Sequence, residues 1–168
     1  MCWWRCGQLQ HDSVVVDKQL ELRLAAARGD TDRVLRWLSK GATPDGEDQC
    51  GWTPLCCAAW GGHAEVARLL VERGADPNRA QTRDDQTPLC QAASKGNAAT
   101  VVVLIHTGAD PRLPNAQTGE TPLTQALDAD HQETVAALRL AVGEQRLAGP
   151  QASGLRTADG TQPVLQGM

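Results

Sequence analysis

Six cysteines and four histidines are the side chains in this sequence best suited to chemistry. They are Cys2, Cys6, Cys50, Cys56, Cys57 and Cys90, together with His11, His63, His106 and His131. A structural zinc site needs two pairs of such ligands at a short spacing. Cys2 and Cys6 form one CxxxC pair, and no second pair follows at zinc-finger spacing. The pattern therefore predicts no metal site.

The sequence also lacks the signs of an enzyme. A nucleophilic enzyme needs a Ser or Cys beside a general base, with a third group that orients the base. No such set is apparent, and no glycine-rich motif that would hold a phosphate occurs. We therefore predict that the protein is not an enzyme and that it has no catalytic residue and no cofactor.

The amino-acid composition limits which residue types can form the core and which classes of partner are expected. The 168 residues include no Phe and no Tyr, so a core must be built from Leu, Val and Ala. The net charge of −4 argues against nucleic acid, which is usually met by a basic surface. No apolar run reaches the roughly 20 residues that span a bilayer, and residues 1–10 lack the apolar core of a secretory signal. We expect a monomer in the cytoplasm or nucleus, with reduced cysteines, that binds neither nucleic acid nor membranes.

Two short motifs recur at a fixed spacing. Thr-Pro-Leu begins at Thr53, Thr87 and Thr121, so that successive copies are equally spaced. Gly-Ala-Asp-Pro begins at Gly74 and Gly108, which are separated by the same interval. A period of about 34 residues is typical of a solenoid, in which each unit packs on its neighbours.

One unit, residues 51–78, resembles an ankyrin repeat. The resemblance rests on Thr-Pro-Leu at 53–55, Ala-Ala at 58–59, Gly-His at 62–63, Leu-Leu at 69–70 and Gly-Ala-Asp-Pro-Asn at 74–78. It covers roughly residues 17–143 and implies an all-α solenoid whose units each contain an inner helix, a tight turn, an outer helix and a projecting loop. It also implies that loop tips and inner helices form a concave face that holds other proteins.

Local chemistry agrees with this unit. Thr53 can cap the inner helix, and Pro54 suits the first helical position, where its missing N–H costs nothing. Gly62 and Gly74 are placed to end the two helices in left-handed geometry.

The β-branched run Thr100–His106 would favour a strand if taken alone. The repeat register places it on an outer helix, and we expect stacking to override the local preference.

The register predicts four ankyrin repeats, two internal and two capping, at about residues 17–50, 51–84, 85–118 and 119–143. In the first repeat Arg33 and Arg36 occupy positions where the second repeat has apolar residues, and in the last repeat Arg139 occupies such a position. Charged residues at these positions indicate that the first and last repeats cap the stack. Residues 1–16 are predicted to be a flexible arm. Residues 144–168, with many Gly and Gln and few large apolar groups, are predicted to be a disordered tail.

Cys56 and Cys90 occupy equivalent places in successive repeats. Packed helices lie about 10 Å apart, beyond the roughly 7 Å Cα separation that a disulfide allows, so we interpret both as small core thiols. The family usually has His at this place, and with Cys56, Cys90 and Thr124 there we expect to lose about 0.5–1.5 kcal/mol per missing hydrogen bond. His63 and His131 match the family's turn histidine, which implies a hydrogen-bonding role.

Candidate partner-binding residues are carried over by position onto the concave face. Trp52 precedes the capping Thr53 and Trp60 ends the same helix, so both should border the groove, as partner contacts or as packing residues. Exposed tryptophans are enriched in interface hot spots. The candidates are Arg28, Gln49, Cys50, Trp52, Trp60, Arg83, Asp84, Gln86, Ser94, Lys95, Gln117, Glu120 and Asp128.

These observations favour a non-enzymatic protein–protein interaction module, such as an adaptor, scaffold or regulator, that binds a protein or peptide on the concave face. An alternative hypothesis is a thiol-based redox sensor or metal-binding protein. It would use Cys2, Cys6, Cys50 and Cys56.

Overall fold

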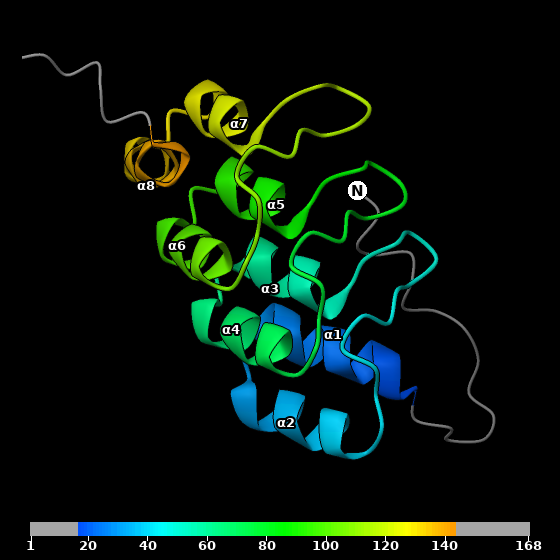
Figure 1. The fold of residues 1–168 in the computed structure, drawn as a ribbon. Coiled ribbons are helices and arrows are strands. Elements are labelled where there is room, and N and C mark those ends of the chain that lie inside the picture. Colours follow the sequence, from blue (N-terminus) through cyan, green and yellow to red (C-terminus); the bar gives the residue numbers. More distant parts are fainter. Residues whose placement is uncertain (1–16, 144–168) are drawn as a thin grey trace, which may run out of the picture.

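The computed structural model describes residues 17–143. Within that range eight α-helices form four pairs, without a strand (Figure 1). The inner helices are α1 (Lys18–Arg28), α3 (Pro54–Gly61), α5 (Pro88–Ser94) and α7 (Pro122–Asp128). The outer helices are α2 (Thr31–Ser39), α4 (Ala64–Glu72), α6 (Ala98–His106) and α8 (Gln132–Val142). The predicted all-α solenoid is confirmed. The predictions for residues 1–16 and 144–168 lie outside the described range.

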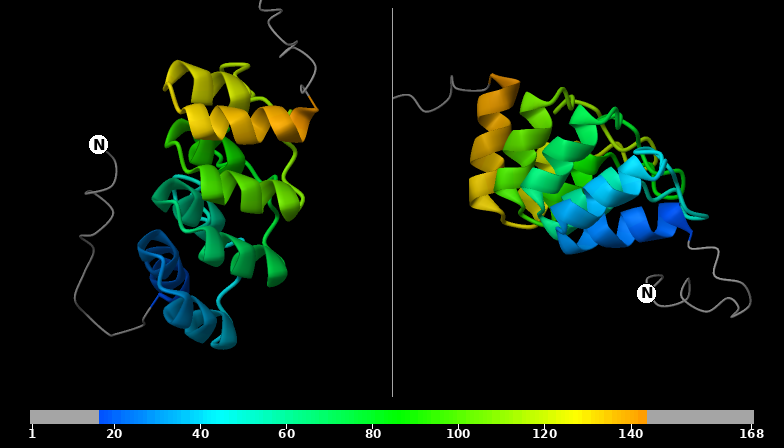
Figure 2. Two further views of the ribbon diagram at one scale, coloured as in Figure 1. Left: turned by 90° about the vertical axis from the view of Figure 1, so that its left-hand side faces the viewer. Right: turned by 90° about the horizontal axis from the view of Figure 1, so that it is seen from below.

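The helices form two layers. Each inner helix packs on the inner helix of the next pair, and the outer helices do the same. Figure 2 shows the pairs stacked from α1 and α2 at one end to α7 and α8 at the other. The loops that join the pairs project on the side of the inner helices (Figure 1). We call residues 40–53, 73–87 and 107–121 the first, second and third loop, and the surface formed by the loops and the inner-helix ends the inner face.

Helix ends follow the local signals in the sequence. The Thr of each Thr-Pro-Leu is an N-cap whose hydroxyl accepts a hydrogen bond from the backbone N–H three residues later. Gly62 ends α3 with a φ of 77°, as predicted. At Thr124 the expected loss of a hydrogen bond is wrong, because its hydroxyl accepts from the Thr121 N–H at 2.8 Å and completes a capping box.

The core repeats along the stack. Leu55 and Leu89 of the inner helices and Leu70 and Leu104 of the outer helices are all buried between the layers. The β-branched run lies in α6, as the register predicts, and contributes Val101 to this core. No helix within residues 17–143 is long and apolar enough to cross a membrane.

One loop position is left-handed in all three loops. Gly51, Asp85 and Gly119 occupy equivalent places, one period apart, with φ of 79°, 47° and 72°. A residue with a Cβ is strained there by about 1–2 kcal/mol, although Asp tolerates the region better than most. Replacing Asp85 with Gly is therefore expected to raise the free energy of unfolding by about 0.5–1 kcal/mol, after the entropic cost of glycine. Urea denaturation measures this change, and a lower midpoint for the variant would contradict the argument.

Candidate functional site

Two tryptophans and a lysine meet on the inner face. The rings of Trp52 and Trp60 pack edge to face, with centroids 5.9 Å apart and planes at 83°. Lys95, directly after α5, places its ammonium 3.5 Å from the centroid of the Trp60 ring. This cation–π contact and the aromatic contact hold the Trp60 ring in place while 41% of the residue stays exposed. We call these three residues the tryptophan cluster.

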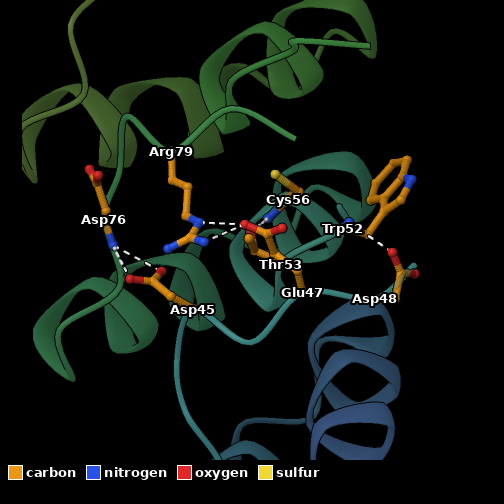
Figure 3. A network of polar contacts seen from close by, with 8 residues as sticks. All are labelled: Asp45, Glu47, Asp48, Trp52, Thr53, Cys56, Asp76 and Arg79. Atoms are coloured by element: carbon orange, nitrogen blue, oxygen red, sulfur yellow. Dashed lines mark hydrogen bonds and ion pairs between the residues drawn. The ribbon is translucent and has the colours of Figure 1, made fainter. Parts of the chain in front are cut away.

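The backbone around Trp52 is fixed on both sides. The Asp48 carboxylate accepts hydrogen bonds from the N–H groups of Cys50 and Trp52, both at 2.9 Å. Immediately after Trp52, the Thr53 hydroxyl accepts from the Cys56 N–H at 3.1 Å (Figure 3). The indole is therefore presented by a turn and a helix cap rather than by a free loop.

The first and second loops are also tied to each other. The Asp45 carboxylate accepts from the Asp76 N–H at 3.1 Å, and the Arg79 guanidinium donates to Glu47 at 2.6 Å (Figure 3). Exposed ion pairs contribute little stability. The contacts of Asp45 and Arg79 therefore serve mainly to fix the distance between the first and second loops.

The second and third loops are tied through their tips. Gln117 donates to the Arg83 carbonyl at 2.8 Å, and Asn115 donates to the Asp84 carbonyl at 2.7 Å. Three of the predicted partner-binding residues, Arg83, Asp84 and Gln117, thus also have a structural role. Sequence reasoning could not predict these bonds, because they depend on how neighbouring loops stack.

A second feature of the inner face is a hollow of about 320 Å³ between the third and fourth pairs. Its lining includes two carboxylates and no lysine or arginine from the described part of the chain. The lining residues are Gln86, Ser94, Glu120, Gln125, Asp128 and Ala129. It is a shallow, open depression rather than an enclosed cavity, and we call it the acidic hollow. Four of the six are predicted candidates, and Gln125 is a site residue that sequence reasoning missed.

The remaining candidates lie singly on the inner face. Arg28 is the last residue of α1 and is exposed. Gln49 is exposed and Cys50 half-buried at the tip of the first loop. No side-chain hydrogen bond or ion pair joins these three to one another within residues 17–143, so they form no cluster of their own.

The turn histidines join neighbouring pairs. The His63 Nε2 donates to the Ala27 carbonyl at 3.0 Å, and the His131 Nε2 donates to the Ser94 carbonyl at 3.3 Å. Asn97, at the equivalent place, donates to the Ala59 carbonyl at 2.9 Å. The predicted hydrogen-bonding role is confirmed. The sequence did not show that each bond reaches back to the inner helix of the preceding pair.

The cysteines of the described range, Cys50, Cys56, Cys57 and Cys90, are free thiols, and Cys56 and Cys90 are buried. Burial raises the pKa of Cys56 from 9.0 to about 11 and that of Cys57 to about 12. It also raises the pKa of Cys90. The thiolate is the nucleophile and the metal ligand, so a protonated Cys56 is poorly suited to the sensor or metal role of the alternative hypothesis. Cys2 and Cys6 lie outside the described residues.

The shifted pKa of Cys56 predicts alkaline destabilisation. Between pH 9 and about 11 the unfolded chain loses this proton while the folded chain keeps it. The free energy of unfolding should therefore fall by about 1.4 kcal/mol per pH unit from this thiol and level off above the folded pKa. Urea denaturation at several pH values measures the slope. Cys56→Ala should make the slope shallower by that amount, and equal slopes for both proteins would contradict the assignment.

Comparison with known proteins identifies the family. The family model for ankyrin repeats, in three copies, matches residues 22–115 and 78–145. The chain belongs to the ankyrin-repeat family. Ankyrin repeats are in general protein–protein interaction modules and typically non-enzymatic.

Individual relatives share the repeats alone. The chain is 44% identical over 55 residues to an ankyrin repeat-containing protein of Schizosaccharomyces pombe, covering 33% of this chain and 27% of that protein. It is 34% identical over 80 residues to human ankyrin repeat, SAM and basic leucine zipper domain-containing protein 1, covering 44% and 17%. It is 42% identical over 66 residues to mouse 2-5A-dependent ribonuclease, covering 39% and 9%. The chain thus spans less than a third of the length of each of these relatives.

Proposed function

We propose that this ankyrin-repeat chain is a non-enzymatic adaptor or scaffold that binds a segment of another protein across its inner face. The observation that carries the proposal is the tryptophan cluster. Burying the exposed part of a large aromatic ring is a strong source of binding free energy, and tryptophan is enriched among residues whose truncation costs about 2 kcal/mol or more.

The surroundings of the cluster support the same role. Trp60 is held by Trp52 and by Lys95, and the loops beside it are tied to each other by hydrogen bonds. A surface that is already ordered loses little conformational entropy when a partner binds. Polar loop tips around an aromatic centre match the usual anatomy of an interface, an apolar core with a polar rim. The proposal includes a monomer in the cytoplasm or nucleus that binds neither nucleic acid nor membranes.

Affinity capture tests this proposal. A Trp52→Ala/Trp60→Ala variant, checked for helicity by circular dichroism, should lose proteins that the wild type captures from a lysate, as identified by mass spectrometry. The matched control is Val102→Ala/Leu140→Ala, which truncates two exposed apolar residues on the outer helices. Capture that survives in the folded tryptophan variant would contradict the inner face as the binding site.

A further inference from the structure

Two cations without a carboxylate partner accompany the exposed tryptophan of the inner face. Arg28, Gly61 and Lys95 occupy equivalent places in the first three pairs, since each directly precedes a left-handed glycine. Arg28 and Lys95 are exposed, and neither forms an ion pair within residues 17–143. The Asp48 carboxylate, which accepts from the Trp52 N–H, pairs with neither of them. Both positive charges are thus available to a partner.

The two cations belong to the helices on either side of Trp60. Its helix, α3, lies between α1 and α5 in the stack (Figure 1). On the side of α5, the Lys95 ammonium lies over the Trp60 ring. On the side of α1, the Ala27 carbonyl, directly before Arg28, would be only 3.2 Å from a Cβ built on Gly61. Gly61 is exposed and places no side chain between the two cations.

The contact between Lys95 and Trp60 selects the charge of a group that can join the tryptophan cluster. The ammonium lies 3.5 Å from the ring centroid. A cation of the partner that approached the same ring would be repelled by this ammonium, whereas a carboxylate would be attracted. Because the ring already holds the ammonium in place, Lys95 loses little conformational freedom when it pairs with that carboxylate.

We propose that the tryptophan cluster and Arg28 bind a partner segment in which an apolar residue lies beside Asp or Glu side chains. The proposal rests on the proposed function, because the apolar residue would cover the exposed part of Trp60, and it adds the charge of the partner. Ammonium and guanidinium groups donate charge-assisted hydrogen bonds to carboxylates, which are stronger than bonds between neutral groups.

The rest of the inner face favours an acidic protein segment over a nucleic acid. Aromatic rings beside cations can also bind single-stranded nucleic acid, whose bases stack while its phosphates meet the cations. A nucleic acid carries a phosphate at every position, and the Glu120 and Asp128 carboxylates of the acidic hollow would repel those that reach the fourth pair. A protein segment can place its carboxylates beside Trp60 alone.

The stack also sets the spacing of the carboxylates in the partner. The Lys95 ammonium lies on the Trp60 ring itself, so its carboxylate should directly precede or follow the apolar residue. Packed helices such as α1 and α3 lie about 8–10 Å apart, and an extended chain rises about 3.3 Å per residue. The carboxylate that pairs with Arg28 should therefore lie about three positions from the apolar residue.

Nuclear magnetic resonance tests the charge and the spacing directly. The probe is the peptide acetyl-GDADLDADG-amide, which places Asp at these spacings on both sides of a leucine. It is titrated into 15N-labelled protein beside the Asn peptide acetyl-GNANLNANG-amide, the Lys peptide acetyl-GKAKLKAKG-amide and a short oligothymidylate.

The Asp peptide should shift the indole N–H signals of Trp52 and Trp60 and bind about tenfold more tightly than the Asn peptide at low salt. The Lys peptide should bind more weakly than either. Equal or tighter binding of the Asn or Lys peptide would overturn the proposal. Tighter binding of oligothymidylate than of the Asp peptide would overturn it in favour of a nucleic acid.

Two variants separate these cations from the overall charge. Arg28→Gln/Lys95→Gln should bind the Asp and Asn peptides with equal affinity, whereas Lys95→Arg, which keeps the charge, should retain the preference for Asp. The control Arg36→Gln/Arg73→Gln makes the same change in net charge at exposed positions on α2 and directly after α4. It should retain the preference, and a preference that survives in Arg28→Gln/Lys95→Gln would overturn the site.

The capture experiment distinguishes this inference from the proposed function. Partners lost with Trp52→Ala/Trp60→Ala but retained at full affinity by Arg28→Gln/Lys95→Gln would leave the inner face as the binding site and overturn the acidic segment. Partners retained by both variants would overturn the proposed function itself. Partners weakened by both variants, together with the preference for the Asp peptide, would support both.

Discussion

Replacing Leu70 with alanine should lower the free energy of unfolding by about 2–5 kcal/mol. Leu70 is fully buried on α4 and belongs to the core between the two helix layers. The substitution removes the transfer free energy of the buried methyl groups and leaves a cavity. In a stack whose stability is close to a sum of nearest-neighbour terms, an internal pair loses packing on both of its sides.

Urea denaturation followed by circular dichroism measures this loss. The matched control is Leu140→Ala on α8, because Leu140 is 60% exposed and its truncation should change the free energy of unfolding by about 0.5 kcal/mol or less. Similar losses for the two variants would contradict the core that the structure shows.

Replacing Gly51 with alanine should lower the free energy of unfolding by about 2–4 kcal/mol, the second largest effect expected. Gly51 is left-handed, with a φ of 79°. A Cβ on Gly51 would also overlap the backbone nitrogen and the hydroxyl of Thr82 in the second loop. Backbone cannot move aside as a flexible side chain can, so the two loops would have to separate.

Gly119→Ala isolates the steric part of this effect. Gly119 holds the equivalent place in the third loop with a φ of 72°, and a Cβ there would meet nothing within 4 Å. Its replacement should cost only the left-handed strain, about 1–2 kcal/mol. If denaturation gives the same loss for both glycines, contact between the first and second loops contributes nothing. Since Gly51 precedes Trp52 directly, its replacement should also weaken partner capture.

The repeat period accounts for most of the fold that sequence alone predicts. Thr53 and its equivalents identify where the inner helices begin, and the register assigns Thr100–His106 to α6 against its local preference for a strand. These predictions succeed because a period fixes every unit once one unit is understood. The capping box at Thr124 was missed, because the hydroxyl of Thr124 can itself accept a hydrogen bond from the Thr121 N–H where a histidine is absent.

The candidate site could be predicted from the sequence only in part. Position in the repeat placed Trp52, Trp60, Glu120 and Asp128 on one face, and the structure brings each pair into a common feature. The same reasoning could not find the ammonium of Lys95 over Trp60, since that contact depends on side-chain conformation across two units.

Gln125 was missed for a related reason. Glutamine is usually a surface residue, and only the structure shows it buried. The available signal was the recurrence of glutamine at positions 91 and 125, which are one period apart on inner helices. A polar residue repeated at an inward position indicates a buried hydrogen-bonding group.

The turn residues His63, Asn97 and His131 give the stack a direction. Each donates to a carbonyl in the inner helix of the preceding pair, while Asp30, at the same place in the first pair, caps its own helix α2 instead. During synthesis the N-terminal part of a chain leaves the ribosome first. Every new helix pair therefore emerges to find its acceptor carbonyl already made, so the order of translation is also the order in which these bonds can close.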